Sequence, residues 1–342
     1  MRALRLVAHG TPGTFEYGDV PTPTPGAGEV RVSVRACGLN RLDLWLEEAG
    51  LPMPLQLPRI PGGEVSGVVD AVGTDVNEWV AGDRVAIQSN LFCGTCEYCE
   101  RGEESMCLSS RLLGVQCDGG FAEAVVVPAR ALVRLPAGVD FVESAALTLA
   151  GSTAMHMLTD RGHVREGQSV LVVGGASGVG AAAIQIAKGL GARVLATASS
   201  PAKRTFCESL GADVVVDATD PQWPAKVRQA TGKRGVDWVV EHVGGPVLEQ
   251  VFQCLARGGT VVTCGATAGR EVRLSLWPLF VKQQSLVGSY GRTRRDMVAT
   301  LEWAAAKRLR APVDATYPLE RGSEAFARLR RREVSGKLVL VP

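Results

Sequence analysis

The chain has 342 residues, of which 46% are hydrophobic and 21% are charged. That composition is typical of a globular protein, and the length exceeds what one ordinary hydrophobic core accommodates, so we expect two domains. The formal net charge is only +2, which argues against a strongly basic binder. We therefore expect neither nucleic acid nor a membrane as partner.

The N-terminus, MRALRLVAHG, contains no apolar stretch long enough for a signal peptide, and no window of the chain approaches the length of a membrane span. We expect a cytoplasmic protein. The nine cysteines are then expected as reduced thiols or metal ligands rather than as disulfides.

The first 125 residues consist of short strand-like runs that glycine and proline interrupt. Examples are Val30–Ala36, Gly67–Gly73 and Asp83–Ile87. Short strands of this kind with few helical patterns predict a β-barrel-like domain.

The cysteines Cys93, Cys96, Cys99 and Cys107 form the strongest local motif. Four thiolates this close can surround one tetrahedral Zn²⁺ and fix a loop that has few apolar residues. All four ligand positions are then filled by protein, so this zinc is structural. An iron–sulfur cluster is the alternative, but the C-x₃-C-P continuation of ferredoxin motifs is missing.

From about Phe141 the pattern changes, because helical stretches begin to alternate with apolar strand-like runs. Such alternation predicts a parallel, doubly wound sheet. A helix (Met297–Leu309) and a strand (Lys337–Val341) follow, and we expect that strand to return to the first domain. The six predicted strands of the doubly wound sheet are Ser169–Val173, Arg193–Thr197, Asp213–Val216, Val236–Val240, Thr260–Cys264 and Ser285–Gly288.

The first of these strands leads into a glycine-rich turn and a small-residue helix. Glycines allow a tight turn and a close approach to a pyrophosphate, and the helix start offers free N–H groups. The sequence therefore predicts dinucleotide binding at the turn. The expected contact residues are Gly175, Ala176, Ser177, Gly178, Val179 and Gly180.

Two further stretches, Ala36–Asp43 (ACGLNRLD) and Pro61–Gly73 (PGGEVSGVVDAVG), complete a recognisable set with the cysteine cluster and the glycine turn. Together they resemble the medium-chain dehydrogenase/reductase superfamily over essentially the whole chain. The resemblance implies an α/β fold with two domains. A GroES-like β-barrel catalytic domain takes residues 1–149 and 288–342, with the zinc lobe near 93–107. A doubly wound, six-stranded Rossmann domain takes residues 150–287.

Zinc alcohol dehydrogenases of this superfamily hold a catalytic zinc at three positions, which by resemblance are Asn40, Gly63 and Leu149 here. Glycine and leucine carry no donor atom, and an amide oxygen is a poor ligand for a borderline-soft cation. We therefore expect one structural zinc per chain and no catalytic zinc.

The Gly-Leu-Asn-x-x-Asp pattern that ends at Asp43 resembles the quinone oxidoreductase and enone reductase branch, although members of that branch generally lack the cysteine lobe. We therefore expect hydride transfer to a quinone or an α,β-unsaturated carbonyl compound. Such acceptors spread the developing charge without a Lewis acid. Two alternatives stay open: an alcohol dehydrogenase with an unconventional site, and a non-catalytic NADPH-binding redox sensor.

Two polar residues are the catalytic candidates. By resemblance Asn40 lies at the floor of the cleft, where it either donates a hydrogen bond to the substrate or satisfies backbone groups in a turn. Asp43 either orients the structure or takes part in proton relay and substrate positioning. His242 follows the fourth predicted strand, and we expect it to pack rather than to touch cofactor or substrate.

The residues at the end of the second predicted strand indicate which nicotinamide cofactor binds. An acidic residue there would bind the adenosine ribose and mark NAD, but the position is Ala198. Two hydroxyls and two cations follow, which favours NADPH over NADH. The residues expected to hold the 2′-phosphate are Ser199, Ser200, Lys203 and Arg204.

The resemblance also implies a nicotinamide-side contact at Thr153 and contacts along the nicotinamide half at Gly265, Ala266, Val287 and Gly288. In the superfamily the sixth strand, here Gln284–Tyr290, is the usual place for edge-to-edge pairing of two sheets. We expect a homodimer on that resemblance, with a tetramer as the alternative.

Overall fold

The computed structural model describes all 342 residues, and the chain divides into two compact units. We call Met1–Ser152 with Arg292–Pro342 the barrel unit, and Thr153–Gly291 the doubly wound unit. The first boundary falls three residues after the predicted position 149, and the second falls four residues after 288. None of the helices has the length and apolar character that a membrane span requires.

The barrel unit is organised around one long strand, β3 (Glu29–Leu39), to which β4, β8 and β17 all pair. Valines at positions 30, 32 and 34 are buried, while the polar residues between them are partly exposed. This alternation is that of a strand with one face on the core. From Ala36 to Leu39 every residue is buried, and there the C-terminal strand β17 lies alongside.

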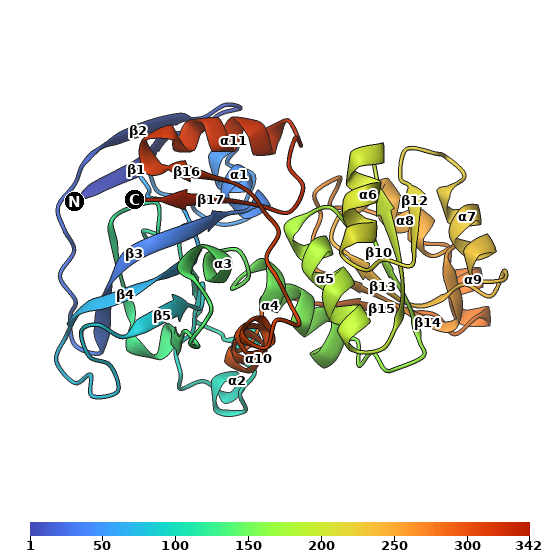
Figure 1. The fold of residues 1–342 in the computed structure, drawn as a ribbon, viewed down its shortest axis with the longest axis horizontal. Coiled ribbons are helices and arrows are strands. Elements are labelled where there is room, and N and C mark those ends of the chain that lie inside the picture. The colour runs from blue at the N-terminus through green and yellow to red at the C-terminus, as the bar shows by residue number, and fades with distance from the viewer. The chain divides into compact units, whose positions relative to one another are not determined.

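That terminal strand confirms the predicted return to the first domain. Strand β17 (Lys337–Val341) pairs antiparallel with β3, with Leu338 opposite Leu39, and both chain termini lie in this unit (Figure 1). The remaining strands of the unit are β1 Arg2–Ala8, β2 Thr14–Asp19, β4 Glu64–Val72, β5 Arg84–Ile87, β6 Asn90–Leu91, β7 Arg111–Leu112, β8 Ala124–Pro128, β9 Leu132–Arg134 and β16 Val313–Pro318.

Short helices connect these strands. One of them, α10, begins three residues before the predicted Met297, because Thr293 and Asp296 form a reciprocal N-terminal cap. The helices are α1 Arg41–Glu47, α2 Glu97–Glu100, α3 Phe141–Ala145, α10 Arg294–Ala305 and α11 Gly322–Arg330, with 3₁₀ turns at Glu104–Met106, Ala129–Ala131 and Leu319–Arg321. Helix α4 (Ala150–Met155) runs across the boundary between the units and continues as a π-helical turn, His156–Asp160.

The doubly wound unit contains the six predicted strands as one parallel sheet in the order β12-β11-β10-β13-β14-β15. The predicted fold class is confirmed. Strand order reverses between β10 and β13, and ligands of such sheets bind outside the carboxyl ends of the strands at this switch point. The strands are β10 Ser169–Val172, β11 Arg193–Ala198, β12 Val214–Asp217, β13 Val236–Glu241, β14 Leu255–Thr263 and β15 Ser285–Gly288.

Five helices cross between these strands (Figure 1): α5 Gly178–Gly189, α6 Pro201–Ser209, α7 Trp223–Ala230, α8 Gly245–Val251 and α9 Leu276–Val281. Helix α5 packs on β10 and β11, and α6 packs on β11 and β12. The small side chains of α5 allow a close helix-to-sheet approach, since Ala181, Ala182 and Ala183 are all buried. The start of α5 is thereby fixed at the end of β10.

Candidate functional site

The glycine turn lies between the end of β10 and the start of α5. Gly174 has φ +65°, a conformation that favours glycine. A Cβ on Gly180 would collide with the carbonyl oxygen of Gly174, so only glycine allows the helix to start this close to the strand. Ser177 is the N-cap of α5, and its Oγ accepts a hydrogen bond from the Gly180 N–H at 2.9 Å.

Three N–H groups of this turn, those of Ala176, Gly178 and Val179, have no acceptor within the chain. The other turn amides are used internally, as when Gly174 N–H donates to Thr197 Oγ1 at 3.1 Å. Free N–H groups at the positive end of a helix are suited to bind an anion such as a pyrophosphate. The predicted turn residues therefore lie together at the switch point of the sheet, and their binding of a dinucleotide stays a prediction.

The end of β11 carries the residues predicted for the 2′-phosphate. Ser199 is exposed, and Ser200 caps α6 by accepting the Lys203 N–H at 3.3 Å. Arg204 is engaged with Asp217, whose carboxylate lies 2.8 Å from the guanidinium. Hydrogen bonds from Thr219 and the charge of Arg204 hold the pKa of Asp217 below its ordinary value.

Sequence reasoning missed Asp217 because it sought an acidic residue only at the tip of the second strand. Asp217 is the last residue of the third strand, β12, which pairs with β11 so that Ala198 and Asp217 are register partners. Asp217 could therefore have been predicted near the 2′-phosphate position, since neighbouring parallel strands end at the same edge of a sheet.

The other predicted cofactor residues lie at the ends of the later strands. Gly265 follows β14 and lies against the loop after β13, where a Cβ on it would be 2.5 Å from the His242 carbonyl oxygen. Gly288 ends β15, and its carbonyl accepts from Arg161 Nε at 3.1 Å. Thr153 is buried on α4. Ala266 and Val287 are partly buried next to Gly265 and Gly288.

In the barrel unit, a buried polar cluster joins Asn40, Glu64 and Lys337. Glu64 Oε2 lies 2.6 Å from Lys337 Nζ and accepts from Asn40 Nδ2 at 2.9 Å. Lys337 Nζ also donates to Asn40 Oδ1 at 2.6 Å and to the Leu39 carbonyl at 2.9 Å. The Glu64 and Lys337 side chains are only 0% and 3% exposed, so both charges depend on these contacts for stabilisation.

The same glutamate reaches the start of α4. Its Oε1 accepts the N–H groups of Leu149 at 2.6 Å and Ala150 at 2.9 Å. Positions 40 and 149 therefore both contact Glu64, which directly follows Gly63 in the chain. The structure brings together the three positions at which the resemblance predicted lost zinc ligands.

Both amide hydrogens of Asn40 are used in this cluster, by Glu64 Oε2 and by the Gly38 carbonyl at 3.3 Å. As the side chain lies, a hydrogen bond to a substrate oxygen requires that one of these two bonds be given up. Asn40 also begins α1, and its N–H donates to Asp43 Oδ2 at 2.8 Å. Its predicted catalytic role stays a prediction.

Asp43 is buried and accepts main-chain N–H groups on both oxygens, from Asn40 and from Gly62 at 3.2 Å. Burial raises the pKa of Asp43 from 3.8 to about 7, against the opposing effects of these hydrogen bonds and of Lys337. The carboxyl therefore links α1 to the segment before β4, in keeping with the orienting alternative, and titrates near neutral pH.

The donor set at positions 40, 63 and 149 does not fit a catalytic zinc. Gly63 has no side chain, and a Cβ there would lie 2.9 Å from the Leu113 carbonyl oxygen. Leu149 offers only hydrocarbon, and the Asn40 oxygen already accepts from an ammonium group. Positions 40, 63 and 149 therefore offer a single donor atom, the Asn40 oxygen, where a catalytic zinc takes three protein ligands.

The four cysteines do fit a metal. Their sulfur atoms all lie within 4.8 Å of one another, and the Cys96–Cys99 and Cys93–Cys99 pairs are 3.5 and 3.9 Å apart. A tetrahedral site with Zn–S bonds of about 2.3 Å has sulfur atoms about 3.8 Å apart. Between residues 93 and 107 only Ser105 and Cys107 are buried, so a bound zinc would supply what holds this lobe.

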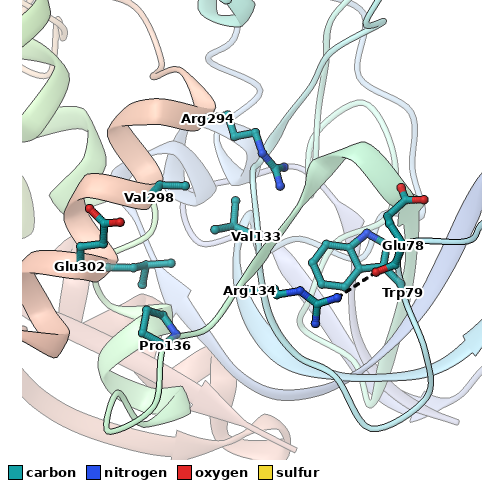
Figure 2. A pocket seen from close by; sticks show the side chains of 9 residues that line it. Glu78, Trp79, Val133, Arg134, Pro136, Arg294, Val298 and Glu302 are labelled. Atoms are coloured by element: carbon teal, nitrogen blue, oxygen red, sulfur yellow. Dashed lines mark hydrogen bonds between the residues drawn. The ribbon is translucent and has the colours of Figure 1, made fainter.

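A separate surface pocket of the barrel unit lies between α10 and β9 (Figure 2). One of its charged groups is already engaged: Arg134 contacts Asp83 at 2.8 Å, donates to the Glu78 carbonyl and stacks on Trp79. None of the predicted site residues lines this pocket. Its lining consists of Glu78, Trp79, Val133, Arg134, Pro136, Arg294, Val298, Leu301 and Glu302.

Comparison with known proteins first defines the class. A family model described as zinc-binding dehydrogenase matches residues 178–306, and one described as alcohol dehydrogenase GroES-like domain matches residues 26–137. Both models describe dehydrogenase domains; the first covers most of the doubly wound unit and continues through α10, and the second lies within the barrel unit. The fold and the matches together define an oxidoreductase with a GroES-like barrel and a doubly wound sheet.

Full-length relatives narrow the class to a family. Alcohol dehydrogenase 1 of Emericella nidulans is 31% identical over 340 residues, covering 98% of this chain and 96% of that protein. An alcohol dehydrogenase of a Moraxella species is 34% identical over 340 residues, covering 98% of each chain. The chain belongs to the medium-chain dehydrogenase/reductase superfamily.

Solved structures agree with this assignment. A crystal structure described as an NAD-dependent alcohol dehydrogenase is 41% identical with a TM-score of 0.96, and each chain is covered completely. A thermostable alcohol dehydrogenase from Pyrobaculum aerophilum is 33% identical with a TM-score of 0.90, covering 100% of this chain and 99% of that one. These names describe the relatives, and reduction of quinones or enones by this chain stays a prediction.

Proposed function

We propose that the protein is an NADPH-dependent oxidoreductase that transfers a hydride to a quinone or an α,β-unsaturated carbonyl compound without a catalytic metal. The observation that carries this proposal is the state of positions 40, 63 and 149. Position 40 holds an amide that is hydrogen-bonded to Glu64 and Lys337. Position 63 is a glycine, and position 149 carries the hydrocarbon side chain of a leucine.

The acceptor class follows from the charge that develops during hydride transfer. Reduction of a saturated ketone places a full negative charge on one oxygen, which zinc alcohol dehydrogenases stabilise with the metal. A conjugated acceptor spreads that charge over an enolate or a hydroquinone. Hydrogen bonds and water then suffice, so residues without metal-ligating atoms favour the conjugated acceptor.

The chain's own residues have three tasks in this proposal. The free N–H groups of Ala176, Gly178 and Val179 bind the pyrophosphate of the cofactor. Bound NADPH supplies the hydride. Asn40 donates a hydrogen bond to the acceptor oxygen after giving up the longer of its two bonds, the 3.3 Å bond to the Gly38 carbonyl. Asp43 holds α1, and with it Asn40, against the segment before β4.

The preference for NADPH is supported by Ala198, which leaves no carboxylate at the usual ribose-binding position. The exposed Ser199 and the half-buried Lys203 add a hydroxyl and a cation nearby. Asp217 opposes this preference in part because it shares the charge of Arg204. We therefore expect the preference to be moderate, at about tenfold in kcat/KM, or about 1.4 kcal/mol.

An acceptor screen tests this proposal. Oxidation of NADPH and NADH is followed at 340 nm with enones, quinones, aldehydes and saturated ketones. We expect kcat/KM for the best enone or quinone to exceed that for every saturated ketone by at least about 100-fold, a difference of about 2.7 kcal/mol in transition-state stabilisation. Chelator treatment that leaves the zinc of the cysteine lobe in place serves as the control and should leave the initial rate unchanged.

Two outcomes would favour the alternatives. Faster interconversion of alcohols with ketones or aldehydes, lost on chelation, would identify an alcohol dehydrogenase with an unconventional metal site. Tight NADPH binding without turnover of any acceptor would identify a redox sensor. Equal kcat/KM values with NADPH and NADH would contradict only the cofactor preference.

We also propose a homodimer that pairs two copies of β15, which is an edge strand of the sheet. An exposed edge with apolar neighbours needs to be covered. Exposed apolar side chains gather along α9 and β15, and Trp277 and Phe280 contact each other edge to face at 5.0 Å. The exposed set is Leu276, Trp277, Phe280, Val281, Leu286 and Tyr290.

Sedimentation tests the dimer. Wild type is expected at twice the 36.1 kDa chain mass, and Trp277→Glu is expected at the monomer mass, because burial of a charge in an apolar contact is unfavourable. Leu108→Glu, at a residue that is 70% exposed in the barrel unit, is the control and should leave the mass unchanged. A monomeric wild type, or a dimeric Trp277→Glu variant, would contradict the proposed interface.

A further inference from the structure

His242 occupies the switch point of the doubly wound sheet. It directly follows β13, and β13 pairs with β10, the strand that leads into the glycine turn. Its ring lies against that turn, since a Cβ on Gly174 would be 3.2 Å from His242 Cε1. General rules for such sheets place the ligand in this crevice.

The imidazole contacts the helix cap of the turn. His242 Nε2 lies 3.2 Å from Ser177 Oγ, and that same oxygen accepts the Gly180 N–H. The hydroxyl hydrogen of Ser177 therefore needs an acceptor elsewhere, and a neutral imidazole nitrogen is one. A neutral imidazole with its hydrogen on Nδ1 leaves Nε2 free to accept from Ser177.

The neutral form of the ring fits its surroundings. Burial lowers the pKa of His242 below its ordinary value of 6.5, against the opposing charge of Glu241 and the main-chain hydrogen bonds. The Glu241 carboxylate is directed elsewhere. Its oxygens accept from Val243 N at 2.6 Å, Gly244 N at 2.7 Å and Thr263 Oγ1 at 2.8 Å.

These bonds also fix the backbone that carries His242. Glu241 is completely buried and holds the loop after β13 through its contacts with Val243 and Gly244. The loop after β14 adds a second contact, because Thr267 Oγ1 donates to the His242 carbonyl at 3.3 Å. The imidazole is thus presented to Ser177 by a loop with little freedom to move.

We infer that His242 is a positioning residue for the dinucleotide: its imidazole accepts the Ser177 hydroxyl, so that the Ser177 oxygen stays on Gly180 N–H. The N–H groups of Ala176, Gly178 and Val179 then stay in the orientation that binds the pyrophosphate. This inference rests on the proposed dinucleotide binding. It assigns His242 an effect on cofactor affinity rather than a part in hydride transfer.

Fluorescence titration with NADPH tests the inference in wild type and in His242→Leu, His242→Gln, Ser177→Ala and the His242→Leu/Ser177→Ala double variant. For His242→Leu we expect a Kd about five- to tenfold higher, because one hydrogen bond is lost. His242→Gln keeps an acceptor and is expected within about twofold of wild type. The double variant is expected to bind no more weakly than His242→Leu, since both substitutions remove the same interaction.

Two further readouts separate positioning from general damage. The kcat at saturating NADPH is expected to stay within about twofold of wild type in His242→Leu, because uniform binding is lost without a change at the reacting atoms. His163→Leu removes an exposed imidazole of the same unit and should leave the Kd unchanged. Circular dichroism melts check that each variant is folded at the temperature of the titration.

The outcomes are distinct. An unchanged Kd in His242→Leu, or effects of the two single variants that multiply in the double variant, would overturn the inference while the proposed function stands. A wild type that binds neither NADPH nor NADH would overturn the proposed function and this inference with it. Tenfold weaker binding in His242→Leu with recovery in His242→Gln would support it.

Discussion

Replacing Lys337 by methionine is expected to lower the free energy of unfolding by about 3–5 kcal/mol, the usual effect of removing one partner of a buried ion pair. Lys337 is the only side-chain cation that contacts Glu64, and both side chains are almost completely buried. Without the ammonium, the carboxylate keeps its N–H donors but loses its charge partner. Urea denaturation followed by circular dichroism measures the loss.

Two further variants test whether the loss of stability in Lys337→Met comes from burial of the ion pair and from the charge left unpaired. Lys188→Met breaks a pair of similar length, 2.8 Å to Asp213, whose side chains are 37% and 36% exposed. That change should cost less than about 1 kcal/mol. The Glu64→Gln/Lys337→Met double variant removes both charges and is expected to be more stable than Lys337→Met alone. Equal losses for Lys337→Met and Lys188→Met would contradict the role given to the buried cluster.

Removal of the zinc from the cysteine lobe is expected to release residues 93–107 while the rest of the barrel unit stays folded. Thiolate coordination contributes on the order of 10 kcal/mol in small zinc domains, and only Ser105 and Cys107 are buried in this lobe. Cys107→Ser should have the same effect as chelation. Limited trypsin digestion measures it through cleavage after Arg101, whose side chain is 52% exposed, with an expected rate increase of about tenfold or more.

Cys117→Ser is the matched control, because Cys117 lies outside the cluster and its Sγ donates to the Leu112 carbonyl at 3.8 Å. It should leave the digestion rate unchanged. A Cys107→Ser variant that resists trypsin as wild type does, with the zinc content also unchanged, would show that these four thiols do not form the metal site.

Local patterns in the sequence were enough to predict the fold. Apolar β-branched runs marked all six parallel strands, and the change from short strands to alternating strands and helices marked the two units. The glycine turn was predictable for a stereochemical reason, since Gly174 and Gly180 occupy positions that a side chain would strain or block. The cysteine cluster was predictable because its ligands are close in sequence.

The polar network around Glu64 was not predictable in the same way. Lys337 contacts Asn40 across 297 positions of sequence, and nothing in a terminal strand that reads KLVLV distinguishes a buried ammonium from an exposed one. The resemblance singled out Asn40, Gly63 and Leu149, but the hydrogen bonds that occupy the Asn40 amide depend on the pairing of β3 with both β4 and β17. For the same reason the Ser177–His242 contact became evident only in the fold.

Hydride transfer without a catalytic metal is the central claim, and the zinc content of the active protein tests it most directly. Purified protein that oxidises NADPH with an enone or a quinone is assayed for zinc by mass spectrometry. We predict one zinc per chain, held by Cys93, Cys96, Cys99 and Cys107. Two zinc ions per chain, with turnover lost when the second is removed, would contradict the account.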